Sequence, residues 1–258
     1  MNKYMVVANW KMNLNPTEAG KLVSQLNQSI VVEPSTEVVI CPPFIDLYPM
    51  SQQLDRKKFG LGSQNIHYLD NGAFTGEISP AMLKGMVDYS IIGHSERRIY
   101  ANEDDALIAK KVAAALRNAI KPILCVGDSL LDYQHGNGTK VVVDQLEADL
   151  HDVTAAQIGD IAIAYEPVWA IGTGNFAKPE DVLPVVAAIR GLITSLYGDA
   201  AAQTARILYG GSVNSDSTKV YLGIDGINGL LVGGASLNYA EFTSIVQAAQ
   251  QHASTQQN

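Results

Sequence analysis

The sequence has few cysteines, few basic residues and no long apolar run, and each shortage excludes a class of protein. Cys41 and Cys125 are the only cysteines in 258 residues, so a disulfide framework is excluded. Both lie in apolar, strand-like runs, where we expect reduced thiols in the core. No apolar stretch reaches the about 18 residues of a membrane-spanning helix, and the first apolar run is too short for a secretion signal. We therefore expect a cytoplasmic protein with no membrane partner.

Basic residues are outnumbered by acidic ones, 18 to 26, which gives a net charge of −8. Phosphate-rich partners normally need a basic face, so nucleic acid is not an expected partner. The 47% hydrophobic and 17% charged residues are typical of a globular chain and argue against disorder. The length suits either two small domains or one α/β barrel of about 250 residues.

Short β-branched runs alternate with longer helical stretches along the chain. The strand candidates are residues 4–8, 37–41, 59–63, 89–92, 122–126, 161–165, 206–209 and 229–232. Nearly continuous apolar strands of this kind suit a parallel sheet that helices cover. We therefore predict an α/β fold in which residues 1–258 form a single (β/α)8 barrel domain, with eight parallel strands and outer helices. An open sheet of eight parallel strands is the alternative.

Helix starts are marked by residues that cap free backbone N–H groups. Residues 15–18 have the spacing of a capping box with proline at the first helical position. Ser79 with Pro80, the acidic segment 102–105 and Asn238 are expected to open further helices. The polar tail from Gln250 to Asn258 is expected to fray.

Polar residues gather directly after the predicted strands. They are Asn9 and Lys11 after the first, Gln64 and Asn65 after the third, His94, Ser95 and Glu96 after the fourth, and Glu166 after the sixth. Gly210-Gly211-Ser212 and Gly233-Gly234 follow the seventh and eighth. In a parallel barrel these points meet at the carboxyl end, where active sites form and where the last two loops commonly bind phosphate. Glycine lets the backbone N–H groups approach an anion, although ordinary tight turns are the alternative.

Glu166 and His94 have surroundings that favour proton transfer. Pro167 keeps Glu166 extended, and the apolar segment 168–171 is expected to cover the carboxylate and raise its pKa. His94 precedes a predicted helix whose dipole favours the neutral ring, which can donate a proton to a carbonyl oxygen. The alternatives are a solvent-exposed glutamate and a core histidine. The five histidines have no metal-ligand spacing, so no metal is expected.

Six separated segments resemble the triosephosphate isomerase family, in the same order and over nearly the whole chain. They are ANWKMN at 8–13, GAFTGEIS at 72–79, GHSERR at 93–98, AYEPVWAIGTG at 164–174, YGGSV at 209–213 and LVGGASL at 231–237. The resemblance implies an isomerase with a TIM barrel and no cofactor. Such an enzyme interconverts dihydroxyacetone phosphate and D-glyceraldehyde 3-phosphate through an enediolate, in glycolysis and gluconeogenesis.

The resemblance also implies a role for each site residue. Glu166 is the base, His94 is the neutral electrophile, Lys11 and Asn9 act near the reacting oxygens and the phosphate, and Glu96 positions Lys11. Gly172, Ser212, Gly233 and Gly234 bind the phosphate. The loop that holds Thr75 enters a second subunit and makes a homodimer.

Three positions depart from the family pattern. Asn175-Phe176 replaces the usual Lys-Thr at the end of the lid, residues 167–177, and we expect Phe176 to pack against the barrel rim as a hinge anchor. Asp128 stands where glutamate is usual, and Asn228 where aspartate is common.

Two other functions compete with the isomerase. A Schiff-base aldolase would need a lysine near the sixth strand, where this chain has Glu166. A sugar-phosphate binding protein on the same fold would not need both Glu166 and His94.

Overall fold

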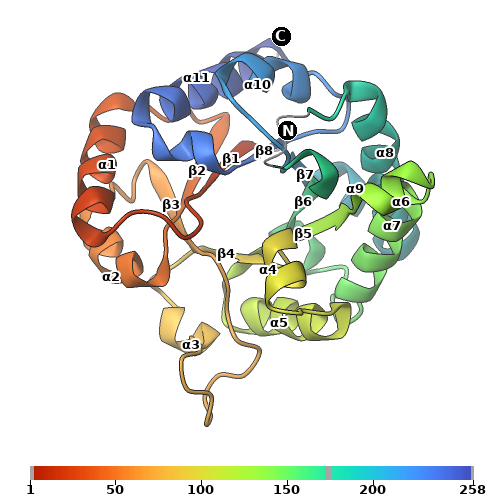
Figure 1. The fold of residues 1–258 in the computed structure, drawn as a ribbon, viewed down its shortest axis with the longest axis horizontal. Helices are drawn as coiled ribbons and strands as arrows, with labels where there is room; N and C mark the ends of the chain where they lie inside the picture. Colours follow the sequence, from red (N-terminus) through yellow and green to blue (C-terminus); the bar gives the residue numbers. More distant parts are fainter. Residues whose placement is uncertain (1–2, 172–175, 257–258) are drawn as a thin grey trace.

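Eight parallel strands form a closed barrel, with helices around its outside (Figure 1), in a computed structural model that describes residues 3–171 and 176–256. The strands are β1 (Tyr4–Asn9), β2 (Thr36–Cys41), β3 (Phe59–Ser63), β4 (Tyr89–Ile92), β5 (Lys121–Asp128), β6 (Ala162–Pro167), β7 (Arg206–Tyr209) and β8 (Gly229–Val232). Each strand pairs with the next in sequence, and β8 pairs with β1 through Met5 and Gly229. The predicted barrel is confirmed, and this last pairing excludes the open sheet.

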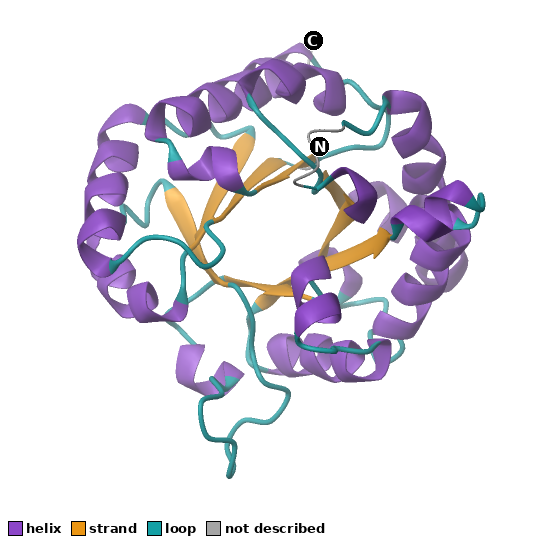
Figure 2. Cartoon of the chain, in the orientation of Figure 1, coloured by secondary structure: helices purple, strands orange, loops and turns teal. Residues whose placement is uncertain are grey.

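Helices and short 3-10 turns connect the strands (Figure 2). The α-helices are α1 (Pro16–Ser29), α2 (Phe44–Gln53), α3 (Pro80–Leu83), α4 (Ser95–Tyr100), α5 (Asp105–Arg117), α6 (Leu130–Gln134), α7 (Gly138–Asp149), α8 (Pro179–Tyr197), α9 (Asp199–Thr204), α10 (Ser215–Leu222) and α11 (Tyr239–Thr255). The 3-10 turns are η1 (Ile158–Asp160), η2 (Val168–Ala170) and η3 (Gly234–Leu237).

The expected caps are present, but the expected fraying of the tail is wrong. Asn15 and Glu18 form the capping box of α1, Ser79 caps α3, and Asn238 caps α11. Helix α11 continues to Thr255, because Gln250 is buried and donates to the Val31 carbonyl oxygen at 2.8 Å.

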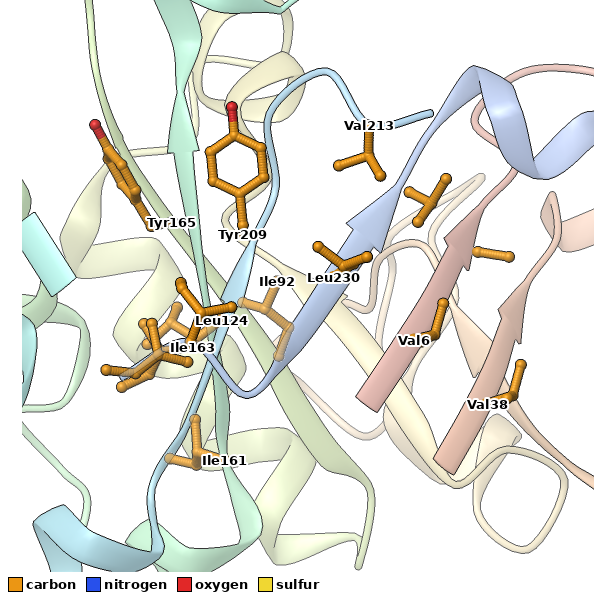
Figure 3. Packing of buried hydrophobic residues seen from close by; sticks show 14 of the residues in the cluster. Val6, Val38, Ile92, Leu124, Ile161, Ile163, Tyr165, Tyr209, Val213 and Leu230 are labelled. Carbon is orange, nitrogen blue, oxygen red and sulfur yellow. The ribbon is translucent and has the colours of Figure 1, made fainter. Parts of the chain in front are cut away.

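The core has two layers, because successive residues of a strand face opposite sides of the sheet. Met5, Val7 and Val39 belong to the cluster inside the barrel. Val6 and Val38 belong to the larger cluster between strands and helices, and in Figure 3 their side chains project from neighbouring strands. The same alternation carries the polar residues at the strand ends into the mouths of the barrel.

The segment between β3 and α3, residues 64–79, projects from the barrel (Figure 1). Near its tip the Phe74 ring packs on His67 of the same segment, with ring centroids 4.3 Å apart, and stays 41% exposed. We call this segment the arm. Within the described part of the chain, no helix is long and apolar enough to cross a membrane.

Candidate active site

Many of the polar residues expected at the carboxyl end of the strands surround a cavity of about 310 Å³, whereas Gln64, Asn65 and Glu96 line a neighbouring one. The described lining of the first cavity is Asn9, Lys11, His94, Glu166, Ile171, Phe176, Gly210, Gly211, Ser212, Val213, Asn214, Leu231, Gly233, Gly234 and Ala235. These residues come from five of the predicted strand ends, so the barrel brings together segments that lie up to 226 positions apart in the sequence. Glu96 does not line this cavity but forms an ion pair with Lys11, which does. Gly172 lies outside the described residues.

Glu166 lies near the end of β6, fully buried, and binds the loop that precedes α4. Its Oε2 accepts the Ser95 N–H at 2.8 Å, and its Oε1 accepts the Ser95 hydroxyl at 3.3 Å. Oε1 also lies 3.0 Å from His94 Nε2. Ser95 was among the polar residues expected after the fourth strand, but no role was assigned to it from the sequence. Its position at the first residue of α4 was the available signal, because the free N–H groups of a helix start bind carboxylates.

The pKa of Glu166 is lowered, which corrects the expectation that the covering loop raises it. Burial does raise the pKa of this carboxyl group. The His94 ring, the Ser95 N–H and the Lys11 charge together outweigh burial. These polar partners therefore decide the direction of the pKa shift, and Glu166 is ionised and ready to accept a proton.

His94 has the hydrogen-bond pattern of a neutral ring. The Glu96 N–H donates to Nδ1 at 3.2 Å, which leaves Nε2 as the protonated nitrogen facing Glu166. Burial lowers the pKa of His94, but the Glu166 carboxylate raises it by more, so the pKa is raised. Because the Glu166 carboxylate raises the pKa of His94, this increase becomes smaller when the carboxylate turns away from the ring.

Lys11 is held in an unusual backbone conformation that aims its side chain at the cavity. Its φ is 53°, in the left-handed region that non-glycine residues rarely occupy. Two contacts hold it there: Asn9 Oδ1 accepts the Lys11 N–H at 3.1 Å, and Gln64 Nε2 donates to the Lys11 carbonyl oxygen at 2.9 Å. The ammonium group then reaches Glu96 Oε1 at 2.7 Å. Sequence reasoning noted Gln64 but missed this supporting contact.

Glycines line the part of the cavity wall that follows β7 and β8. A Cβ on Gly210 would lie 3.1 Å from Glu166 Cγ, and one on Gly233 would lie 3.3 Å from Lys11 Cε. Both are tight contacts, so these positions keep the base and the ammonium group close to the glycine loops. Ser212 also lines the cavity, and its hydroxyl donates to the Ala170 carbonyl oxygen at 2.9 Å.

The described part of the expected lid corrects one prediction. Phe176 does not pack against the barrel rim, since it is 49% exposed and lines the cavity together with Ile171. Trp169 is the residue that is fixed, because its Nε1 donates to Asp128 Oδ2 at 3.1 Å. Asn175, the other residue that departs from the family pattern here, lies outside the described residues.

The cavity offers ammonium and backbone N–H groups, which suit a phosphate, and it offers a carboxylate beside an imidazole, which suits proton transfer. Among residues 3–171 and 176–256, no cluster of three His, Cys, Asp or Glu side chains could hold a metal ion.

Comparisons with known proteins agree with the geometry. The family model described as triosephosphate isomerase matches residues 4–249. A triosephosphate isomerase from Caldanaerobacter subterraneus subsp. tengcongensis is 45% identical over 247 residues, which cover 95% of this chain and 99% of the relative. Those from Carboxydothermus hydrogenoformans (44%, covering 96% of this chain and 100% of the relative) and Clostridium beijerinckii (42%, covering 95% and 99%) are similar over the same length. The chain belongs to the triosephosphate isomerase family.

Proposed function

We propose that Glu166 and His94 carry out the reaction of this family, the interconversion of dihydroxyacetone phosphate and D-glyceraldehyde 3-phosphate in glycolysis. The observation that carries this assignment is the buried carboxylate 3.0 Å from a histidine Nε2, in a cavity that also holds Lys11. Triosephosphate isomerase is the reference case for a glutamate base that works beside a neutral histidine.

The geometry supports a division of labour. Glu166 removes a proton from one substrate carbon and returns it to the next, while His94 Nε2–H donates to the carbonyl oxygen. Both groups now bind each other, and Glu166 also binds Ser95, so the substrate must take the place of these contacts. The carboxylate turns toward the substrate carbon and the ring keeps its place, because Glu96 N–H holds Nδ1.

Lys11 and Asn9 supply the positive charge and hydrogen bonds that the anionic intermediate needs, and Glu96 is the positioning residue for Lys11. We assign phosphate binding to Ser212, Gly233 and Gly234, which line the cavity after β7 and β8. Gly172 completes this set by resemblance. Since the chain carries a net charge of −8, these local donors must overcome an unfavourable overall field.

The assignment is tested by a coupled assay of glyceraldehyde 3-phosphate conversion, run on the wild-type protein and on Glu166→Gln. General base catalysis contributes about 10²–10⁴-fold, so kcat should fall by at least that range while an unreactive phosphate analogue still binds. An active Gln variant would remove Glu166 from this role.

We also propose a homodimer in which the arm of one subunit, around Thr75, enters the other. A second cavity, of about 660 Å³, is bordered by Lys11, Glu96 and Tyr100. Beside it Met12 is 95% exposed and Tyr100 is 81% exposed, and such apolar side chains favour a protein partner. Because the cavity touches Lys11 and Glu96 from outside, the partner would stabilise the active site.

Deletion of residues 72–76 tests the dimer. Sedimentation should show monomers, and isomerase activity should fall strongly, because the Lys11 side of the site loses its support. An intact dimer after the deletion would contradict the assignment of the arm.

Residues 1–258 are proposed to act as one barrel domain, which the match to residues 4–249 supports. The proposed compartment is the cytoplasm, because Cys41 and Cys125 are buried, unpaired thiols of the kind that reducing compartments favour.

A further inference from the structure

We propose that Tyr133 is a positioning residue of the active site, which holds η2, the turn directly after Glu166 and Pro167, in place. It does so by stacking on Trp169 and by bonding to Asp181. This inference rests on the proposed function, and it concerns a residue outside all the segments that resemble the family.

Trp169 is held on one face and at one edge. Its ring stacks on the Tyr133 ring with centroids 4.1 Å apart and planes at 24°. Its Nε1 donates to Asp128 Oδ2 at 3.1 Å, and the other carboxylate oxygen accepts the Tyr165 hydroxyl at 2.9 Å. The hydrogen bond fixes the edge of the indole, and the stack keeps the ring from turning about it.

Tyr133 also contacts the chain beyond the lid. Its hydroxyl donates to Asp181 Oδ1 at 3.0 Å, and Asp181 Oδ2 accepts the Lys178 N–H at 3.1 Å. Asp181 thereby caps the start of α8 while it binds α6. One side chain on α6 therefore connects η2 to the first turn of α8.

The position of η2 matters to the chemistry because residues on both sides of it in the sequence line the cavity. Glu166 precedes it by two residues, and Ile171, which follows it, lines the cavity. Ala170 within it accepts the Ser212 hydroxyl at 2.9 Å. A shift of η2 would therefore move the base and open one wall to water.

Core packing does not explain these contacts. Helix α6 has five residues and none of them is buried, and Tyr133 itself is 41% exposed. Leu130 and Leu131 on the same helix are more than half exposed. Because the Tyr133 ring touches Trp169, we assign its effect to the site and not to the stability of the fold.

Three variants test the proposal. Tyr133→Ala removes the stack and the bond to Asp181, and Tyr133→Phe removes only the bond. Tyr4→Ala is the matched control, because Tyr4 pairs with the His252 ring at 5.2 Å, at the amino end of β1, away from the active site. The measurements are kcat, KM, tryptophan emission, and the ratio of released inorganic phosphate to isomerised product. That ratio does not depend on how much of the protein is folded.

Tyr133→Ala should lower kcat by about tenfold with KM within about twofold, because phosphate binding depends on other loops. It should also raise the phosphate ratio and shift the Trp169 emission to longer wavelength, while Tyr133→Phe falls between it and the wild type. Tyr4→Ala should lower thermal stability without changing kcat or the ratio.

The proposal is overturned if Tyr133→Ala keeps the wild-type kcat, ratio and emission, or if Tyr4→Ala changes the ratio to the same extent. A wild-type protein that does not isomerise would instead contradict the proposed function. In that case the emission still decides whether Tyr133 holds Trp169, since the only other tryptophan, Trp10, is fully buried.

Discussion

The two mouths of the barrel use charge in opposite ways. At the amino mouth, Glu37 of β2 accepts the Tyr89 hydroxyl of β4 at 2.6 Å and binds Arg206 of β7 at 2.6 Å. At the carboxyl mouth, Glu166 contacts His94 and Ser95, and the Lys11 ammonium group contacts Glu96. The first network joins three strands across the barrel, and the second borders a cavity.

The charged residues of the two mouths also differ in backbone conformation. The carboxyl mouth contains Lys11 at a φ of 53°, which costs free energy of about 1–3 kcal/mol and needs support from Asn9 and Gln64. At the amino mouth, Glu37, Tyr89 and Arg206 lie in regular strands, although nearby Ala119, two residues before β5, also has a positive φ, of 59°. The difference teaches that the charged residues of the amino mouth join regular strands, whereas Lys11 at the carboxyl mouth depends on support from its neighbours.

The comparison predicts its largest effect at the carboxyl mouth. Lys11→Met keeps the length of the side chain but removes the charge, so binding of an unreactive phosphate-bearing analogue should weaken by about a hundredfold or more. Calorimetric titration measures this, with Lys57→Met, on the surface near the amino end, as the control. Unchanged affinity in the Lys11 variant would show that the backbone donors alone hold the phosphate.

At the amino mouth the same kind of change should affect stability and leave catalysis intact. Arg206→Leu removes a mostly buried partner of Glu37, so the free energy of unfolding should fall by about 2 kcal/mol with kcat unchanged. Arg56→Leu is the control: its pair with Asp88 is more exposed, and its loss should cost less than about 1 kcal/mol. Denaturant titration measures both, and a loss of kcat in the Arg206 variant would contradict the separation of the two mouths.

The stability lost in Arg206→Leu should depend on pH, because it involves the carboxyl group of Glu37. Burial raises the pKa of Glu37, but the Tyr89 hydroxyl and Arg206 lower it by more, so the pKa is lowered in the folded protein. A group of this kind stabilises the fold above its unfolded pKa and loses that contribution as the pH falls through its folded value. The wild type and Arg206→Leu should therefore approach the same stability at strongly acidic pH.

The barrel could be predicted from the sequence because its signal is local. Apolar runs and turn residues set each strand within about two residues of its observed bounds, as at β5 and β6. The end of α11 was not predictable in this way, because Gln250 is ordered by the Val31 carbonyl, 219 residues away.

The site could be predicted as a set of residues but not as a set of interactions. Strand ends and family segments brought out Glu166, His94 and Lys11, and the structure places all three on one cavity. The pKa direction of Glu166 was wrong, because His94 and Ser95, which are distant in sequence, both face its carboxylate. Phe176 was wrong because an apolar residue does not reveal from sequence whether it faces the rim or the cavity.

A smaller effect concerns the pair at the carboxyl mouth. His94 is the strongest of the groups that lower the pKa of Glu166, and burial, which raises it, remains when the ring is removed. In His94→Gln the pKa of Glu166 should therefore rise. Carbon-13 labelling of the carboxyl group measures this by NMR, with Glu166→Gln to assign the signal. A pKa that stays low would show that Ser95 and Lys11 are sufficient.

The smallest predicted effect returns to the amino end, where Asn228 precedes β8. Its Oδ1 accepts Arg190 Nη2 at 3.1 Å and the Ile207 N–H at 3.1 Å. Burial lowers the pKa of Arg190, and Asp225 opposes this only in part, so the cost of burying that charge is already present in the wild type. Asn228→Asp would place a carboxylate against the existing charge and should raise the free energy of unfolding by about 1 kcal/mol. The gain should shrink as the pH falls below the ordinary pKa of aspartate, and it should disappear once the pH passes the lowered pKa of the paired carboxyl group, which then takes up a proton. Thermal unfolding of both proteins measures it, and the same substitution in an Arg190→Met background is the control. An equal gain in that background would show that the new carboxylate does not act through Arg190. It would also show that pairing the buried charge at the amino end does not stabilise the fold.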